Sequence, residues 1–379
     1  MEQKSNFFSD LPEDIEMEIL SRLPVKCLLQ LKCVNKKWYV LIENPIFIQK
    51  HLHNTKNPTC YFVHHYFLDT MKSGFTLFNH NEQNQLIPKS HLYQDVLNTS
   101  THLWQVLSPL NGLFLLYNDQ EDVALWNPST KEFKPLPISQ PLNCPLSSYK
   151  FDFGIERPLY KLSSYKFGFG IEPSSGDYKV VWMRDYWNVD SEDWHSPTII
   201  SVYTLSTNSW RTFEEFRVSS RNVAKSNGNT YLNGFYYWRA CQNDKIFGFD
   251  MSNDKFFEIQ TPKSFISKQG DLSLFNDFIA MYIYEPIILG RETSIDIWIM
   301  EKNGYWTKNM RIGPFLNIKR SIGYGKNGEI FLEVVTYQLD IFDPFLKNNK
   351  VLSQQKNGYS LQAFAYNESL VSLKNISFL

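Results

Sequence analysis

The segment VALWNPSTKEF (123–133) recurs as ISVYTLSTNSW (200–210) and IFGFDMSNDKF (246–256). In each copy a strand-like run carries an aromatic residue, a polar turn follows, and a second aromatic residue comes seven positions after the first. IDIWIMEKNGYW (295–306) is a variant whose tryptophans lie eight positions apart, and LDIFDPFLKNNKV (339–351) lacks the second aromatic residue. Alternation bounded by turn residues predicts a β-hairpin in each unit.

The spacing of these units predicts the architecture. Their first aromatic residues are separated by 77, 46, 49 and 44 positions, and most units follow another strand with its own turn, such as NGLFLLY (111–117). A period of about 45–50 residues with several strands is typical of propeller blades, because one small twisted sheet cannot bury both faces whereas a ring of sheets can. We expect five or six blades over residues 105–379, the first irregular, with the strand LQAFAYNESLVSL (361–373) closing the ring. A β-sandwich is the alternative.

The interval of 77 residues contains a tandem duplication. LSSYKFDFGIE (146–156) is repeated as LSSYKFGFGIE (162–172), with ten of eleven residues identical at an offset of 16. Added loop length costs little closure entropy, so a tolerated surface loop is one interpretation. A recognition loop peculiar to this protein is the other, and unchanged partner binding after deletion of residues 146–161 would exclude it.

Residues 9–53 follow a helical pattern. Apolar residues recur at intervals of three and four, first at Ile15 and Ile19 and then from Leu28 to Trp38. This spacing predicts three or four short helices. A module of about 45 residues has only a marginal core. We therefore expect part of its apolar surface to face a partner.

Charge is segregated within this helical region. Residues 1–20 hold six acidic side chains and one lysine, whereas residues 22–50 hold six basic side chains and one glutamate. Helix-dipole matching with solvated faces is one interpretation. A partner with complementary charged stripes is the other.

Residues 54–104 are weakly periodic, and we expect a connecting or entry region there. Seven of the eight histidines fall between His51 and His102, with Cys60 among them. No acidic or second cysteine ligand lies at a suitable spacing, so surface histidines in a linker are favoured over a metal site. The predicted fold class is α+β in two parts, a small all-α module followed by an all-β, propeller-like domain.

The composition excludes several classes of function. The formal net charge is -1, with 38 basic and 39 acidic side chains, which argues against a generally basic nucleic-acid binder. Five scattered cysteines without a C-x-x-C pair argue against a disulfide framework, so we expect reduced thiols in the cytoplasm, with the nucleus as a further compartment. No apolar run approaches the ~18 residues of a spanning helix, so no membrane partner is expected.

The sequence contains no convincing catalytic motif. Gly323, Gly325 and Gly328 match G-x-G-x-x-G, but the next residues, EIFLEVV (329–335), predict a strand where a dinucleotide site needs a helix. A hairpin turn is the better interpretation. We expect no enzyme activity, no cofactor and no metal site.

RDYWNVDSEDWH (184–195) is the candidate substrate-binding segment. We interpret it as a blade-connecting loop whose acids and tryptophans suit a protein-binding rim, because tryptophan is enriched in interface hot spots. Packing of its aromatic residues on the propeller is the alternative. The candidate contact residues are Asp185, Tyr186, Trp187, Glu192, Asp193 and Trp194.

The helical region resembles an F-box. The resemblance covers LPEDIEMEILSRLPVKCLLQLKCVNKKWYVLIENPIFIQKHL (11–52), including Leu11-Pro12, Ile19-Leu20, Leu23-Pro24, Cys33-Val34, Lys37-Trp38 and the Pro45/Phe47 end. Val34-Asn35 departs from the commoner Cys or Ser before the Lys-Trp pair. An F-box implies docking on a Skp-family adaptor, which binds a cullin scaffold. The residues expected to build that interface are Leu11, Pro12, Ile15, Ile19, Leu20, Leu23, Pro24, Leu28, Val34 and Trp38.

Most of the remaining chain resembles the plant F-box-associated, kelch-like region. The segments that carry this resemblance are NGLFLLY, LWNPSTKEFKPLP (125–137), FGFGIEPSSGDYKVV (167–181), VYTLSTNSWR (202–211), YLNGFYYW (231–238), FGFDMSNDKFFEIQTP (247–262) and IDIWIMEKNGYWTK (295–308). Their order and the terminal AYNESLVSLK (365–374) most resemble the S-locus F-box proteins of self-incompatible plants and their relatives.

The resemblance implies a non-catalytic substrate-recognition subunit of an SCF-type E3 ubiquitin ligase. The F-box would dock on the adaptor and the propeller would hold a protein substrate, so that catalysis comes from the proximity of a substrate lysine to a charged ubiquitin carrier. In the S-locus class the implied substrate is the pistil S-ribonuclease of non-self haplotype, met in pollen.

Three alternatives remain open. One is a general plant F-box receptor for another regulatory or immune protein. Another is a propeller enzyme or sugar-binding module with a small ligand in its central channel. The third is an F-box protein that acts as a scaffold without a cullin.

Overall fold

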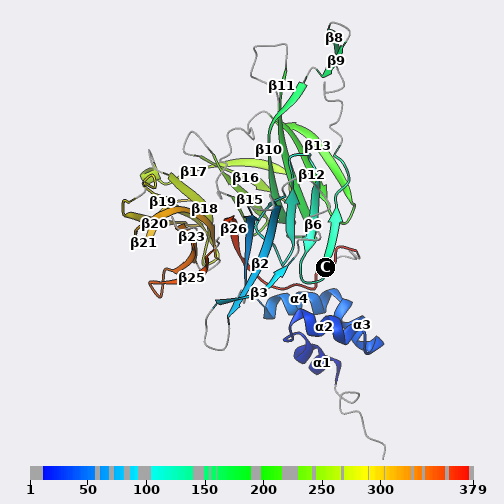
Figure 1. The fold of residues 1–379 in the computed structure, drawn as a ribbon. Coiled ribbons are helices and arrows are strands. Elements are labelled where there is room, and N and C mark those ends of the chain that lie inside the picture. Colours follow the sequence, from blue (N-terminus) through cyan, green and yellow to red (C-terminus); the bar gives the residue numbers. More distant parts are fainter. Residues whose placement is uncertain are drawn as a thin grey trace, which may run out of the picture.

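The computed structural model shows four helices packed against one end of a larger β structure (Figure 1). It describes residues 12–55, 60–67, 72–80, 86–92, 104–139, 149–152, 155–158, 160–188, 198–215, 229–240, 245–265, 269–288, 290–302, 304–325, 328–334, 338–354 and 358–374. Within these ranges, no helix combines the length and the apolar character needed to cross a bilayer.

The four helices form the small all-α module expected from the apolar periodicity, here called the helical module. They are α1 (Glu13–Leu20), α2 (Val25–Lys32), α3 (Lys36–Glu43) and α4 (Pro45–Asn54). Two asparagines set the helix starts, since Asn35 Oδ1 accepts from the Lys37 N–H and Asn44 Oδ1 accepts from the Ile46 N–H, both at 2.8 Å. Pro45 occupies the first turn of α4, where its missing N–H costs little.

Six four-stranded antiparallel sheets follow, and we number them as blades 1 to 6. Blade 1 is β26 (Gly358–Tyr366), β1 (Cys60–Phe67), β2 (Lys72–His80) and β3 (Leu86–Leu92); blade 2 is β4 (Gln105–Val106), β5 (Phe114–Tyr117), β6 (Val123–Asn127) and β7 (Glu132–Pro135). Blade 3 is β10 (Tyr160–Ile171), β11 (Tyr178–Asn188), β12 (Thr198–Thr204) and β13 (Ser209–Glu215); blade 4 is β14 (Asn229–Leu232), β15 (Phe235–Arg239), β16 (Lys245–Asp250) and β17 (Lys255–Gln260). Blade 5 is β18 (Gln269–Phe275), β19 (Phe278–Tyr284), β20 (Thr293–Met300) and β21 (Trp306–Phe315); blade 6 is β22 (Ile318–Tyr324), β23 (Ile330–Val334), β24 (Gln338–Asp343) and β25 (Asn348–Gln354).

Within the described ranges, three shorter elements lie outside the blades. β8 (Tyr149–Asp152) and β9 (Ile155–Pro158) form a two-stranded hairpin between blades 2 and 3, and a 3-10 turn spans Lys263–Phe265. The hairpin lies at the end of the molecule opposite the helices (Figure 1).

The repeated aromatic spacing is the outer hairpin of a blade. Tyr203 on β12 and Trp210 on β13 are direct cross-strand partners, with ring centroids 5.3 Å apart. Phe249 and Phe256 pair in the same way, at 4.9 Å. Seven positions bring the two rings opposite each other across a short turn, and such pairs each contribute about 0.2–1 kcal/mol.

Hydrophobic clusters between neighbouring blades close the ring. Phe62 and Trp126 belong to the cluster between blades 1 and 2, with ring centroids 5.7 Å apart. Other clusters lie between blades 4 and 5, blades 5 and 6, and blades 6 and 1. The largest cluster extends through blades 2, 3 and 4 and into the helical module. These sheets form the predicted propeller, with six blades, and the β-sandwich alternative is wrong.

The expectation of a connecting region at 54–104 needs correction. β1, β2 and β3 are three strands of blade 1, and β26 supplies its fourth, with Cys60 paired to Tyr366 and Phe67 to Gly358. β1 is buried on both faces, since Phe62 packs toward blade 2 and Val63 toward blade 6. A strand covered on both faces lacks the alternation of apolar and polar residues that marks a half-exposed strand. Its sequence pattern therefore does not predict a strand. The prediction that the strand 361–373 closes the ring is confirmed in part, because β26 pairs with β1 but ends at Tyr366, and residues 367–374 follow it without strand structure.

The expectation of surface histidines in a linker is wrong for His51, His64 and His65, whereas His53 is exposed on α4. His51, His64 and His65 are each 1% exposed. Burial, with a smaller effect of nearby His65, lowers the pKa of His64 to about 3, so this ring is neutral inside blade 1. No group of three or more metal-ligating side chains occurs within the part of the chain that the structure describes.

Candidate functional site

The helical module leaves several large apolar side chains in solvent. Val34 is 73% exposed, and Ile15 and Ile19 on α1 are each 44% exposed. The exposed apolar set consists of Ile15, Ile19, Val34, Tyr39, Val40 and Ile46. Single exposed apolar residues are normal on a protein surface, whereas six between Ile15 and Ile46 are a high concentration for so small a module.

The predicted adaptor residues divide by burial. Ile15, Ile19, Val34, Pro12 and Pro24 are exposed. Leu23 and Trp38 are half-buried and pack against the core cluster, and Leu11 lies outside the described residues.

Two of the predicted residues are buried in the core of the helical module. Leu20 is 5% exposed and Leu28 is 0% exposed, and both belong to the hydrophobic core. The apolar repeat does not separate the face of a short helix that packs inward from the face that stays in solvent. Sequence reasoning missed Tyr39, Val40 and Ile46, although Tyr39 and Val40 directly follow the Lys-Trp pair.

The segregated charges meet within the helical module. Lys37 Nζ lies 2.6 Å from Glu16, whose side chain is 3% exposed, and Lys50 Nζ lies 2.6 Å from Glu18. Hydrogen bonds from Lys50 and Arg22 hold the pKa of Glu18 near 2. These pairs join the acidic start of the chain to its basic continuation, which favours internal pairing over an uncovered charged stripe.

Helix α4 joins the module to the propeller. His51 lies 3.0 Å through Nε2 from the carbonyl oxygen of Leu23, and Asn54 Nδ2 donates to Ser21 Oγ at 2.8 Å. Burial lowers the pKa of His51 below 6.5, and the hydrogen bond to Leu23 opposes that shift. The end of α4 is thus tied to the loop after α1.

The segment 367–374, which follows β26, contacts both the helical module and the propeller. Leu370, Val371 and Leu373 are buried in the cluster that also contains the core of the helical module. Glu132 on β7 accepts hydrogen bonds from the backbone N–H of Leu373 and the hydroxyl of Ser372, at 2.5 and 3.2 Å. The segment therefore fixes the helical module on blade 2.

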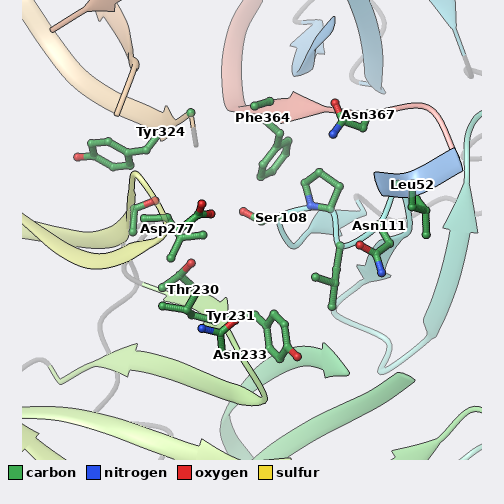
Figure 2. A pocket seen from close by; sticks show the side chains of 18 of the residues that line it. Leu52, Ser108, Asn111, Thr230, Tyr231, Asn233, Asp277, Tyr324, Phe364 and Asn367 are labelled. Atoms are coloured by element: carbon green, nitrogen blue, oxygen red, sulfur yellow. The ribbon is translucent and has the colours of Figure 1, made fainter. Parts of the chain in front are cut away.

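A cavity of about 830 Å³ opens where α4 meets the centre of the ring (Figure 2). Figure 2 shows Asn111, Asn233 and Asp277 on turns of three different blades around this space, with Leu52 of α4 at its edge. Among the described residues, the lining includes hydroxyl, amide and aromatic side chains, the ring of His53 and the carboxylate of Asp277, but no Lys or Arg. Its size lies within the ~300–1,000 Å³ range of small-molecule sites.

A buried carboxylate supports the wall of this cavity. Asp271 on β18 is 2% exposed and accepts hydrogen bonds from the hydroxyls of Tyr324 and Ser321, both at 2.7 Å, and of Tyr284 at 3.0 Å. Burial and the Asp271 charge raise the pKa of Tyr324 well above its usual value. The phenol is therefore a fixed hydrogen-bond donor that joins blades 5 and 6.

The three described members of the predicted substrate-binding set lie on a strand and not on a loop. Asp185, Tyr186 and Trp187 belong to β11, and Asp185 and Tyr186 are 4% and 7% exposed. Asp185 accepts a hydrogen bond of 2.5 Å from Thr198 Oγ1 across the sheet. Glu192, Asp193 and Trp194 lie outside the described residues. The expectation of a loop is wrong for 185–187, because this strand continues past the residues that pair with β12.

The glycine motif forms a hairpin, as predicted. Gly323 lies near the end of β22. The Gly325 N–H donates a 2.7 Å hydrogen bond to the carbonyl of Glu329 across the turn. Gly328 has a φ of 85°, a conformation that favours glycine. β23 follows directly, so no helix N-terminus is available for a phosphate.

Comparison with known families agrees with both parts of the structure. A model of the F-box associated beta propeller domain matches residues 65–342, and a model of the F-box domain matches residues 8–50. The first match begins within β1, in line with the corrected start of the propeller.

The relatives with similar sequences are named as F-box or F-box/kelch-repeat proteins. An F-box/kelch-repeat protein of Arabidopsis thaliana, At3g17570, is 27% identical over 66% of this chain, and the match spans 58% of that relative's length. A second Arabidopsis thaliana F-box/kelch-repeat protein, At3g23880, is 24% identical over 86% of this chain and 85% of its own. The Arabidopsis thaliana F-box protein CPR1 is 24% identical over 88% of this chain and 82% of its own.

The helical module therefore corresponds to an F-box, and the six-bladed ring corresponds to the F-box associated beta propeller domain. The chain belongs to the F-box-associated beta propeller family.

Proposed function

We propose that this protein is the substrate-recognition subunit of an SCF-type E3 ubiquitin ligase. The F-box docks on a Skp-family adaptor, which connects it to a cullin. The propeller holds a protein substrate, and the ligase brings a charged ubiquitin carrier to the substrate lysine. The protein itself makes and breaks no covalent bond, and its contribution to the rate is proximity.

One observation carries this proposal, namely the exposed apolar set of the F-box. The core of the module is already complete with Leu28 and its buried neighbours, so these six side chains are not needed to stabilise the fold. Removal of exposed apolar surface from water is favourable in free energy, and the binding of a partner achieves it. The family match to the F-box gives that partner its class, a Skp-family adaptor.

The arrangement of the two parts supports a substrate site away from the F-box. The helices cover one end of the ring, and the ends of β10 and β11 with the β8–β9 hairpin project at the other (Figure 1). The segment 367–374 gives the junction a defined geometry, because it is hydrogen-bonded to Glu132 of blade 2 and is buried in the cluster that contains the core of the F-box. A fixed distance between adaptor and substrate is what proximity catalysis requires.

The test is co-purification with a plant Skp-family adaptor. The double variant Ile19→Glu/Val34→Glu changes two exposed side chains, so the fold is retained, while charges enter the docking surface. We expect at least a ~10-fold weaker affinity, as for central interface positions. The matched control is Ile138→Glu, at a 91% exposed position after blade 2. Undiminished binding by the double variant, or equal loss in the control, would contradict the proposed surface.

The substrate class is a finer part of the proposal. The S-locus resemblance favours the pistil S-ribonuclease of non-self haplotype, recognised in pollen, and another regulatory or immune protein is the alternative. Expression confined to pollen, with binding of non-self but not self ribonuclease, supports the first. Expression in leaf and root without ribonuclease binding supports the second.

A second candidate role is the binding of a small neutral molecule in the cavity between α4 and the propeller. The cavity has hydrogen-bonding groups on several blades, and its described lining holds no Lys or Arg that would favour an anionic ligand. A thermal-shift screen with neutral sugars tests this role, with Asn233→Ala as the variant that should abolish any shift. The absence of a shift with every sugar would leave the ubiquitin-ligase role alone.

A further inference from the structure

The two copies of the duplicated segment fold differently. In the first copy (146–156), β8 and β9 form a hairpin in which Asp152 pairs with Ile155. The second copy (162–172) runs through β10, the first strand of blade 3, and pairs with β11 along its length. Because ten of the eleven residues are identical, local propensity does not explain the difference.

The single difference between the copies falls at a tightly packed position. The first copy has Asp152 where the second has Gly168. A Cβ at position 168 would lie 2.5 Å from Cζ2 of Trp238 and 2.9 Å from Cδ1 of Tyr236. Both rings are buried, and the Trp238 Nε1–H donates a 2.9 Å hydrogen bond to the carbonyl of Phe167. A side chain here forces a fixed aromatic ring to move, and a carboxylate would also lose its hydration.

The turn after each copy is a second difference. Glu172 ends the second copy and accepts hydrogen bonds from the backbone N–H groups of Ser174 and Ser175, at 2.9 and 2.8 Å. Glu156 ends the first copy but is followed by Arg157-Pro158. The turn therefore also favours the second copy, and an experiment has to separate the two influences.

The choice of copy determines where the extra residues lie. With the second copy in the sheet, they precede β10 and lie at the end of the propeller away from the helices (Figure 1). With the first copy in the sheet, the same 16-residue offset would lengthen the turn 172–177. That turn lies at the F-box end, since Asn111 Nδ2 donates to the hydroxyl of Tyr178 at 3.2 Å and Asn111 lines the cavity with Leu52 of α4.

We propose that Gly168 and Asp152 together lock the register of the duplication. Gly168 admits the second copy under Trp238, and Asp152 excludes the first copy from the same place. The lock keeps the additional residues away from the F-box junction and displays them at the opposite end of the ring. This steric inference holds whether or not the protein serves a ubiquitin ligase.

The test exchanges the two residues in the full-length protein. Gly168→Asp puts aspartate in both copies, and we expect the melting temperature to fall by about 5–10 °C. The double variant Asp152→Gly/Gly168→Asp restores one glycine-bearing copy, and we expect it to regain at least half of that loss. Hydrogen exchange read by mass spectrometry should show protection at 162–172 in the native protein and at 146–156 in the double variant.

Two controls separate the residue from the turn and from the insertion. Asp152→Gly alone keeps Gly168 and the native turn, so protection should stay at 162–172 with an unchanged melting temperature. Deletion of residues 146–161 keeps a single copy with Gly168 and should melt within about 2 °C of the native protein. The proposal is overturned if Gly168→Asp has native stability. It is also overturned if the double variant is no more stable than Gly168→Asp or keeps its protection at 162–172, because the turn would then set the register.

Discussion

The side-chain amide of Asn127 donates a 2.8 Å hydrogen bond to the backbone carbonyl of Val371, 244 residues further along the chain. The same amide donates to the carbonyl of Ser369 at 3.1 Å, and Asn127 Oδ1 accepts from the N–H of Ser129 at 2.9 Å. Asn127 is fully buried at the end of β6. One side chain thus connects the second blade, its own outer turn and the segment that packs beneath the F-box.

We expect Asn127→Ala to lower the free energy of unfolding by about 2–4 kcal/mol, because it leaves two buried carbonyl groups without their donor. Urea unfolding followed by tryptophan fluorescence measures this loss. The matched control is Asn309→Ala on the exposed edge of β21, where a change within about 0.5 kcal/mol is expected. Equal losses in both variants would show that Asn127 is not a tie of this kind.

The corrected division of the F-box predicts opposite phenotypes for two apolar residues. Leu28→Ala removes a fully buried side chain and should cost about 2–5 kcal/mol of stability. Val34→Ala truncates a side chain that is 73% exposed and should change stability by less than about 0.5 kcal/mol. Thermal unfolding of both variants without the adaptor checks this, and a larger loss at Val34 would contradict the described packing.

Stability should depend on pH through His64. Its two ring nitrogens have no hydrogen-bond partner among the described residues, and it stacks on Phe75 at 4.7 Å between ring centroids. Its pKa is about 3 in the folded protein and near 6.5 when unfolded, so the unfolded chain binds the extra proton between these values. The stabilisation is complete above pH 6.5 and is lost as the pH falls, by up to about 1.4 kcal/mol per pH unit.

The variant His64→Phe isolates this contribution, since an aromatic ring of similar size keeps the contact with Phe75 but does not titrate. Urea unfolding at pH 7.5, 6.0 and 5.0 should give a smaller decrease with acidification for the variant than for the native protein. The neutral form of His51 adds a dependence of the same sign in both proteins. Identical pH profiles would mean that His64 is not the titrating group.

The contact between blades 5 and 6 should depend on Asp271. Asp271→Ala removes the acceptor of three hydroxyl groups and should cost about 2–4 kcal/mol. Ser321→Ala removes one of those donors and should cost about 1 kcal/mol. Urea unfolding of both variants, with their midpoints compared with that of the native protein, measures the two losses. A loss in Asp271→Ala no greater than that in Ser321→Ala would contradict a three-way tie.

The features of the fold that the sequence predicts correctly are determined by residues close together in the chain. The aromatic residues seven positions apart become cross-strand partners through a short turn, as Tyr203 and Trp210 do. The apolar spacing of three and four places four short helices between Glu13 and Asn54. Both features follow from the local geometry of hairpins and helices, so a short window contains what is needed to predict them.

The burial of the candidate site residues is harder to predict, because it depends on contacts between residues distant in sequence. Leu28 and Val34 belong to the same apolar repeat, yet one is in the core and the other is exposed. Asp185 and Tyr186 lie in a polar, aromatic stretch typical of a loop, yet Asp185 pairs with both β10 and β12, and Tyr186 pairs with β10 and packs with Ile199. The neighbours that decide these cases come from other elements, and the periodicity of one segment does not include them.

The amino-acid sequence by itself determined the repeating hairpin, the helical start of the chain and the family. The tertiary structure alone decided that β1 closes the ring by pairing Cys60 with Tyr366. It also decided which of two nearly identical segments becomes a blade strand. In both cases a contact between residues far apart in the chain contributes, Cys60 with Tyr366 or Gly168 with Trp238, and only the packed ring brings them within reach.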